Sequence, residues 1–266
     1  MAGSDVRFEK TGGVATVTLD RPQVRNALSA DSMDQLVSAL EECRSPQVRA
    51  VVLTGAGGAF CSGADVRGFT DVLEGGAEGL SAHLRTQAGR LHRGVIMAIR
   101  ELPKPVIAAV DGVAAGGGLG LALACDLRLA SERARFVMAY AGIGATADGG
   151  STYYLPRLVG PALAMEMYLV NQPISAQRAL EMGLVNRVVP GEELGRHVME
   201  LAGRLASGPT VAFGRVKALM DACWSTDLGS QLDAETAAIS GIALTSDFQE
   251  GVTAFVEKRA PRFRGE

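Results

Sequence analysis

The stretch "KPVIAAVDGVAAGGGLGLALACDLRLAS", residues 104–131, decides the fold class. Its apolar run at 105–110 predicts a buried strand, because the prolines of "LPKP" stop the preceding helix. The glycines at 116–118 then open a short apolar helix that runs through Ala124, and "LRLA" at 127–130 predicts another strand. A strand, a glycine turn, a helix and a strand in this order are typical of an α/β fold.

The same alternation extends towards the N-terminus. Strands are predicted at 14–19 and 49–55, and a helix capped by Ser29 or Ser32 is predicted at 29–42. A longer helix is predicted at about 83–102. Its apolar face would consist of Leu84, Ala88, Leu91, Val95, Ile99 and Leu102.

The second half of the chain has a different pattern, in which helices follow one another without intervening strands. The predicted helical stretches are 161–170, 175–183, 192–207, 209–222 and 227–258. The sequence therefore predicts an α/β core over residues 1–195 and a C-terminal helical region over 196–266. The apolar faces of that region predict packing on the core or on a neighbouring subunit.

Composition narrows the class of protein. The 266 residues carry a net charge of −3, which gives no electrostatic footprint for nucleic acid. No run of 18 apolar residues and no secretory leader are evident, so we expect no membrane association and a cytoplasmic protein. The four cysteines are far apart and show no metal-ligand spacing, so we expect free thiols and no metal site.

Several familiar nucleotide-binding and catalytic motifs are either absent or in the wrong structural context. "GIGATA" at 142–147 fits a dinucleotide-binding pattern, but it does not clearly follow a strand or lie at the first βα turn. The chain has no P-loop and no hydrolase elbow. His83, His92 and His197 lie on predicted helices at no ligand spacing, so the sequence does not support a histidine acid or base.

Two glycine-rich strand exits remain, "FCSGAD" at 60–65 and "DGVAAGGGLG" at 111–120. Small residues there allow a ligand to approach the backbone, and the second exit opens a helix whose first N–H groups are unpaired. Side by side, the exits could each direct one N–H at a single oxygen and form an oxyanion hole. Ordinary close packing of strand and helix explains the glycines equally well.

A third stretch, "ATADGGSTYYLPRLVG" at 145–160, holds one carboxylate, Asp148, beside two glycines. Asp-Gly is a common turn dipeptide, so a turn is the simplest interpretation of an isolated case. Whether this carboxylate has a chemical role depends on what the rest of the chain supplies.

Five segments together identify a resemblance. "RPQVRNALS", "VVLTGAGGAFCSGADV", the stretch at 104–131, "LPRLVGPALAMEMYLVNQPISAQRALEMGLVNRVV" and "EGVTAFVEKRAPRF" are similar to the enoyl-CoA hydratase/isomerase (crotonase) superfamily, in the family's order and over nearly the whole chain. The resemblance implies a spiral of ββα units, a C-terminal trimerisation region, and acyl-CoA thioester substrates with no separate cofactor. It further implies that the N–H groups of Ala64 and Gly117 bind the thioester oxygen.

The acids expected of a hydratase are missing. Hydratases of this family carry two glutamates, at positions where this chain has Gly120 and Tyr140. Glycine cannot orient or deprotonate water, and tyrosine, with an ordinary pKa of about 10, is a poor base at neutral pH. Asp148 occupies the loop position of an essential aspartate in dienoyl-CoA isomerases and in ring isomerases of phenylacetate breakdown. We therefore expect a thioester isomerase in which Asp148 moves the proton.

The resemblance also implies a substrate and coenzyme A surface. It would consist of Arg25, Ala27, Ser62, Asp65, Val66, Gly116, Gly118, Tyr140 and Gly149, with Arg67, Lys258 and Arg259 as candidate phosphate partners. A homotrimer or a dimer of trimers is the expected assembly. The alternatives are a hydratase or another reaction of the superfamily, and a member that binds acyl-CoA without turning it over.

Overall fold

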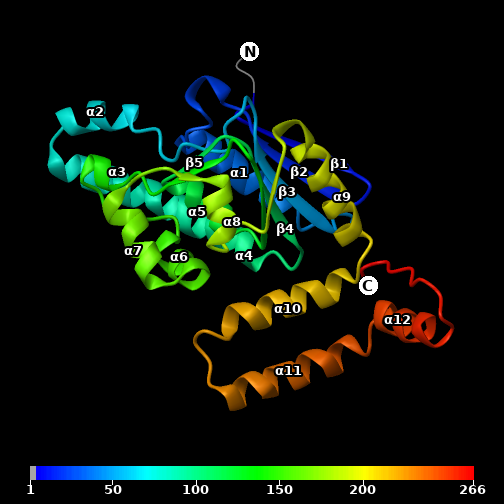
Figure 1. Cartoon of the computed structure of the whole chain (residues 1–266). Helices are drawn as coiled ribbons and strands as arrows, with labels where there is room; N and C mark the ends of the chain where they lie inside the picture. The colour runs from blue at the N-terminus through cyan, green and yellow to red at the C-terminus, as the bar shows by residue number, and fades with distance from the viewer. Residues whose placement is uncertain (1–3) are drawn as a thin grey trace.

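The computed structural model describes residues 4–266, and its centre is a six-stranded sheet (Figure 1). The strand order is β1-β2-β3-β4-β6-β9, with β1 antiparallel to β2 and every other neighbouring pair parallel. The strands are β1 (Val6–Thr11), β2 (Val14–Leu19), β3 (Ala50–Gly55), β4 (Val106–Val110), β6 (Leu127–Ser131) and β9 (Arg187–Val189). The short N-terminal strand β1 was not expected from the sequence.

A second, three-stranded sheet consists of β5 (Val113–Ala115), β7 (Arg135–Val137) and β8 (Ile174–Ser175). The chain alternates between the two sheets: β4 leads into β5, β6 leads into β7, and β8 is followed by β9. In the units that begin at β4 and at β6, one strand enters each sheet before a helix follows, whereas α8 lies between β8 and β9. This alternation is the spiral of ββα units that the resemblance implied, and the prediction is confirmed.

Helices cover both faces of the main sheet. On one face lies α1 (Ala30–Glu42), whose start is a reciprocal capping box: Ser29 and Ser32 each accept the other's backbone N–H. On the other lies α9 (Leu194–Ala206), whose buried residues join Val52 and Ile107 in a separate cluster. The predicted division between 195 and 196 falls inside α9, so the part of the chain that leaves the sheet begins after this helix.

The long helix predicted at 83–102 begins earlier and is irregular. It consists of α3 (Ala77–Gly89), a π-helical stretch η2 (Arg90–Ile96) and α4 (Met97–Glu101). The predicted apolar residues from Leu91 onward are buried, whereas Leu84 is exposed, contrary to the predicted apolar face. A preceding helix, α2 (Arg67–Glu74), was not predicted, and Figure 1 shows it at the edge of the molecule.

The remaining helices of the body follow the sheet strands. They are η1 (Pro22–Val24), α5 (Gly117–Ala124), η3 (Ala141–Ile143), α6 (Ser151–Val159), α7 (Pro161–Val170), α8 (Ala176–Glu181) and η4 (Gly191–Glu193). All eight residues of α5 are buried, because this helix runs through the middle of the larger hydrophobic core. The "GIGATA" segment begins within η3 rather than at a strand exit.

The C-terminal helices are α10 (Thr210–Ala222), α11 (Leu228–Ile242) and α12 (Ser246–Val256), and the stretch predicted as 227–258 is broken between the last two. Figure 1 shows α10 and α11 as an antiparallel pair that lies apart from the sheets. A partly buried ion network holds α10 to the body, in which Arg100 and Lys217 both contact Asp126 at 3.0 Å. No helix among residues 4–266 is both long and apolar enough to cross a membrane.

Candidate active site

The two glycine-rich strand exits run side by side. Cys61 and Ala114 form a parallel bridge, in which the N–H of Cys61 donates to Val113 and the N–H of Ala115 donates to Cys61. Contact between the exits is close, because a Cβ on Gly63 would lie 2.9 Å from the carbonyl oxygen of Ala115. These backbone pairs place the residue after Gly63 beside the start of α5.

Two N–H groups at this junction have no protein acceptor. Among residues 4–266, neither Ala64 nor Gly117 donates its backbone N–H to another group. Gly117 is the first residue of α5, where an N–H has no partner within the helix. The Ala64 N–H is oriented indirectly: the carbonyl of Gly63 accepts from Leu28 at 2.7 Å, and the trans peptide points the Ala64 N–H the opposite way.

Glycine is required at two positions around these donors. Gly116 has φ 51° and ψ −125°, a conformation that is accessible mainly to glycine. Gly118 faces the other exit, where a Cβ would lie 2.3 Å from the carbonyl oxygen of Cys61. Close backbone packing therefore explains Gly118 without a contact to substrate.

Asp148 lies at the same junction. Its Oδ1 would be 3.9 Å from a Cβ on Gly117, so the carboxylate borders the space next to the Gly117 N–H. The side chain is 37% exposed, which leaves it open to a ligand. The hydroxyl and the N–H of Ser151 both donate to the Asp148 carbonyl, which fixes the loop. A simple turn role does not explain why the carboxylate lies beside the first residue of α5.

Tyr140 is the immediate partner of Asp148. Its hydroxyl donates to Asp148 Oδ1 at 2.6 Å, and its side chain is buried. Burial, and then the charge of Asp148, raise the pKa of Tyr140 well above its ordinary value, so the hydroxyl stays protonated and remains a donor. The sequence predicted Tyr140 as a pocket residue, and the structure directs its hydroxyl to the aspartate. The second oxygen, Oδ2, remains available for proton transfer.

The aspartate loop packs directly on α5. A Cβ on Gly120 would lie 2.4 Å from the carbonyl oxygen of Gly149, and a Cβ on Gly149 would lie 3.4 Å from the Cα of Gly117. Gly149 itself has φ 61°. The absence of a side chain at position 120 is therefore what allows the loop to bring Asp148 up to Gly117.

The sequence analysis gave His92 no role as an acid or base, although the residue lies at the site. Its Nε2 accepts the N–H of Gly149 at 3.0 Å and lies 3.8 Å from Asp148 Oδ2. As an acceptor, Nε2 carries no proton, so the hydrogen of the neutral ring is on Nδ1. His92 lies in the π-helical stretch, an irregularity that is often found at functional sites. No local spacing could reveal this contact, because the two residues are far apart in sequence.

Comparison with known proteins decides the family. The enoyl-CoA hydratase/isomerase family model matches residues 9–266. The chain belongs to this family.

Relatives in the family carry different names. The chain is 43% identical to "Probable enoyl-CoA hydratase" of Rhodobacter capsulatus, over 100% of both chains, and 37% identical to 1,2-epoxyphenylacetyl-CoA isomerase of Escherichia coli, over 95% of both. It is 41% identical to 4-chlorobenzoyl coenzyme A dehalogenase-2 of Arthrobacter, over 80% of this chain and 76% of the relative. The crystal structure of an enoyl-CoA hydratase from Bacillus anthracis matches with a TM-score of 0.91 and 35% identity, covering 98% and 100%.

The segment expected at the nucleotide end of an acyl-CoA has a strained backbone that buried hydrogen bonds hold in place. Arg25 and Asn26 both have positive φ, at 52° and 57°. Asn26 is buried, and its side-chain amide donates to the carbonyls of Ala56 and Ala59. These contacts offset the backbone strain of the two residues.

The other predicted contact residues have varied surroundings. Ala27 is buried, whereas Val66 is exposed at the start of α2. The Ser62 hydroxyl donates to the Val24 carbonyl at 3.2 Å, and the Asp65 carboxylate is bound by Arg67 and by a second arginine.

The two C-terminal phosphate candidates differ. Arg259 is held in ion pairs with Glu250 and Glu257, whereas Lys258 forms no ion pair within residues 4–266. Groups of three or more metal-ligating side chains are absent from the described residues.

Proposed function

We propose that this family member is a coenzyme A thioester isomerase that shifts a double bond from the 3- to the 2-position of the acyl chain. The observation that carries the proposal is Asp148, a single carboxylate that borders the unpaired N–H of Gly117. The two positions of the family's hydratase glutamates hold Gly120 and Tyr140. Gly120 makes room for the loop that carries Asp148, and the Tyr140 hydroxyl donates to Asp148 Oδ1.

The mechanism follows from the geometry. With the thioester oxygen between the Ala64 and Gly117 N–H groups, Asp148 Oδ2 removes a proton from C2, and the electron pair moves through C1 onto the oxygen, which gives a dienolate conjugated with the C3–C4 double bond. The N–H groups stabilise that charge, and removing one such donor typically costs about 10²–10³ in rate. The same carboxyl returns the proton at C4, which leaves the double bond between C2 and C3. Tyr140 holds Oδ1 throughout.

This chemistry needs no cofactor beyond the coenzyme A of the substrate, because one acid moves one proton without a redox step. We also propose a cytoplasmic location. Cys43, Cys61 and Cys125 are buried free thiols, and Cys223 is an exposed one, as is usual in a reducing compartment. Burial raises the pKa of the Cys61 thiol, which lies beside the site, to about 12, so this thiol stays protonated and unreactive.

A panel of 3-enoyl, 2-enoyl and ring thioesters, followed by mass spectrometry in deuterium oxide, tests the proposal. We expect conversion of the 3-enoyl thioester with deuterium uptake into the acyl chain, and very slow hydration of the 2-enoyl thioester. Rapid hydration would favour a hydratase and contradict the mechanism. Thermal protection by every thioester without any conversion would show a protein that only binds acyl-CoA.

A second candidate function is hydrolytic dehalogenation, which His92 and the Arthrobacter relative favour. Asp148 Oδ2 would attack the chlorinated ring carbon, forming a C–O bond as chloride leaves with its electron pair. Water would then attack the resulting aspartyl ester and pass its proton to His92 Nε2, which must first release the Gly149 N–H, and the hydroxylated ring would leave. Release of chloride from 4-chlorobenzoyl-CoA would support this reaction, and we expect none if the isomerase proposal is correct.

We further propose that the C-terminal helices assemble the chain into a homotrimer or a dimer of trimers. Large apolar side chains on α11 are exposed, with Leu232 and Ile239 two turns apart at 51% and 59%. A cavity of about 360 Å³ also opens among α10, α11, α12 and the C-terminal tail.

The double variant Leu232→Glu, Ile239→Glu is expected to lower the assembly state, because buried charges without partners are strongly disfavoured at an interface. Light scattering after gel filtration at micromolar concentration measures the mass. A monomeric wild-type protein in the same experiment would contradict the proposal, and a glutamate on the exposed Ser38 of α1 provides the control.

A further inference from the structure

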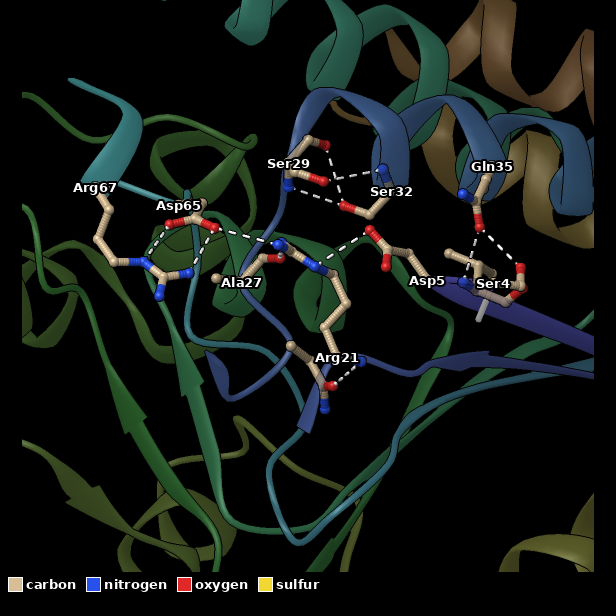
Figure 2. A network of polar contacts seen from close by, with 11 residues as sticks. Ser4, Asp5, Arg21, Ala27, Ser29, Ser32, Gln35, Asp65 and Arg67 are labelled. Carbon is tan, nitrogen blue, oxygen red and sulfur yellow. Dashed lines mark hydrogen bonds and ion pairs between the residues drawn. The ribbon is translucent and has the colours of Figure 1, made fainter. Parts of the chain in front are cut away.

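Arg21 connects three segments of the chain around the oxyanion hole (Figure 2). Its Nε contacts Asp5 at 3.2 Å, one terminal nitrogen donates to the Ala27 carbonyl at 2.6 Å, and the other contacts the Asp65 carboxylate at 3.3 Å. The side chain is only 16% exposed. All three guanidinium nitrogens therefore have partners, which fixes the orientation of the planar group.

Two of these partners flank the backbone that orients the Ala64 N–H. Leu28, next to Ala27, donates to the Gly63 carbonyl at 2.7 Å and accepts from the Asp65 N–H at 3.0 Å. Two hydrogen bonds to the Leu28 backbone, one from each side, therefore fix the peptide between Gly63 and Ala64. Arg21 links the two paired segments. It binds the Ala27 carbonyl on one segment and the Asp65 carboxylate on the other.

We propose that Arg21 and Asp65 are positioning residues of the oxyanion hole, which hold the Ala64 N–H in the direction of the thioester oxygen. The inference rests on the proposed function and deepens it, because neither residue needs to touch the substrate. It gives Asp65 a different role from the coenzyme A contact expected from the sequence.

Arg21 is the more shielded of the two arginine partners of Asp65. Arg67 forms two contacts of 3.0 Å with the carboxylate, but its side chain is 67% exposed, and exposed ion pairs contribute little. Hydrogen bonds from both arginines hold the pKa of Asp65 below its ordinary value, with that of Arg67 the larger effect. The carboxylate is therefore ionised at neutral pH and remains a partner for Arg21.

The test compares Asp65→Asn and Arg21→Lys with Asp20→Asn. Asparagine keeps the size of Asp65 without its charge, and lysine keeps the charge of Arg21 without the fork that bridges Ala27 and Asp65. The control Asp20 is also an arginine-paired carboxylate, bound to Arg7 at 2.7 Å on the edge of the main sheet. Melting temperatures show which variants fold. If Asp65→Asn does not fold, the result for Arg21→Lys decides the test.

Two readouts separate positioning from stability. The first is turnover of a 3-enoyl thioester. We expect kcat to fall about 10-fold or more in both variants, with KM changed much less, because small displacements of a catalytic donor cost up to about 10²-fold. The second is the absorption of a bound dimethylaminocinnamoyl thioester of coenzyme A, which shifts to the red when N–H groups polarise its carbonyl. We expect a smaller shift in both variants and a wild-type shift in Asp20→Asn.

The outcomes distinguish this inference from the proposed function. A red shift in the wild type that is retained in folded Asp65→Asn and Arg21→Lys, with normal kcat, would overturn the inference and leave the oxyanion hole standing. If the wild type gives no shift and turns over no thioester, the proposed function itself fails. A reduced shift with reduced kcat in both variants, while the control stays normal, supports the positioning role.

Discussion

Replacing Asp148 with asparagine is expected to lower the isomerisation rate by about 10²-fold or more, the usual contribution of one acid–base group. The amide has nearly the size of the carboxylate, and its oxygen can still accept the Tyr140 hydroxyl that now donates at 2.6 Å. The loop contacts of Ser151 involve only the Asp148 carbonyl, so the fold should be retained. Turnover of 3-enoyl-CoA by the purified variant measures the effect.

Binding distinguishes loss of chemistry from loss of the site. The variant should still be protected thermally by coenzyme A thioesters, because the two N–H donors are unchanged. A turn role predicts the opposite result, since asparagine forms such turns as readily as aspartate and activity would barely change. Normal isomerisation by Asp148→Asn would therefore remove the central residue from the mechanism.

The variant Gly117→Pro should lose about 10²–10³ in kcat, because it lacks one of the two donors to the thioester oxygen. Position 117 should tolerate proline better than most other helical positions do. Gly117 is the first residue of α5, where proline is well tolerated and where no protein acceptor loses its partner. Gly116, at φ 51° and ψ −125°, mirrors the extended conformation that precedes proline, which an achiral residue adopts readily.

Steric effects are the main alternative explanation for such a loss. A Cβ at position 117 lies 3.1 Å from a methyl carbon of Leu91, so the tip of that side chain must shift by a few tenths of an ångström. The melting curve and the absorption shift of a bound chromophoric thioester show whether the pocket is intact. A folded Gly117→Pro protein with near-normal kcat would show that this N–H does not stabilise the enolate.

Local patterns in the sequence were sufficient for the central βα units and for the start of α1. The strand at 105–110, the glycine turn and α5 follow one another within 20 residues, so their periodicity and glycines carry the information. The serine cap is equally local, and the structure shows that Ser29 and Ser32 act together. The break between α11 and α12 was missed, although Thr245 caps the second helix, because the apolar pattern continues across it.

Contacts between distant segments could not be predicted in this way. His92 meets Gly149 because a π-helical stretch and the aspartate loop converge on α5, and Arg21 meets Asp65 across the start of the first two βα units. Neither pair has a characteristic spacing. Ala64 and Gly117 were located only through the family resemblance, because unpaired N–H groups beside glycines occur in many loops that bind nothing.

The contact between Gly120 and Gly149 constrains how this enzyme could evolve. A hydratase of the family needs a glutamate at position 120, yet any side chain there would collide with the Gly149 carbonyl, 2.4 Å away. That glutamate becomes tolerable only after the loop has moved, and a moved loop carries Asp148 away from Gly117. On the proposed isomerase mechanism, a single substitution to glutamate at position 120 is therefore expected to give a protein with neither reaction. The substitutions that separate isomerisation from hydration are therefore expected to depend on one another. A duplicated gene copy, which is free of selection, could accumulate them together.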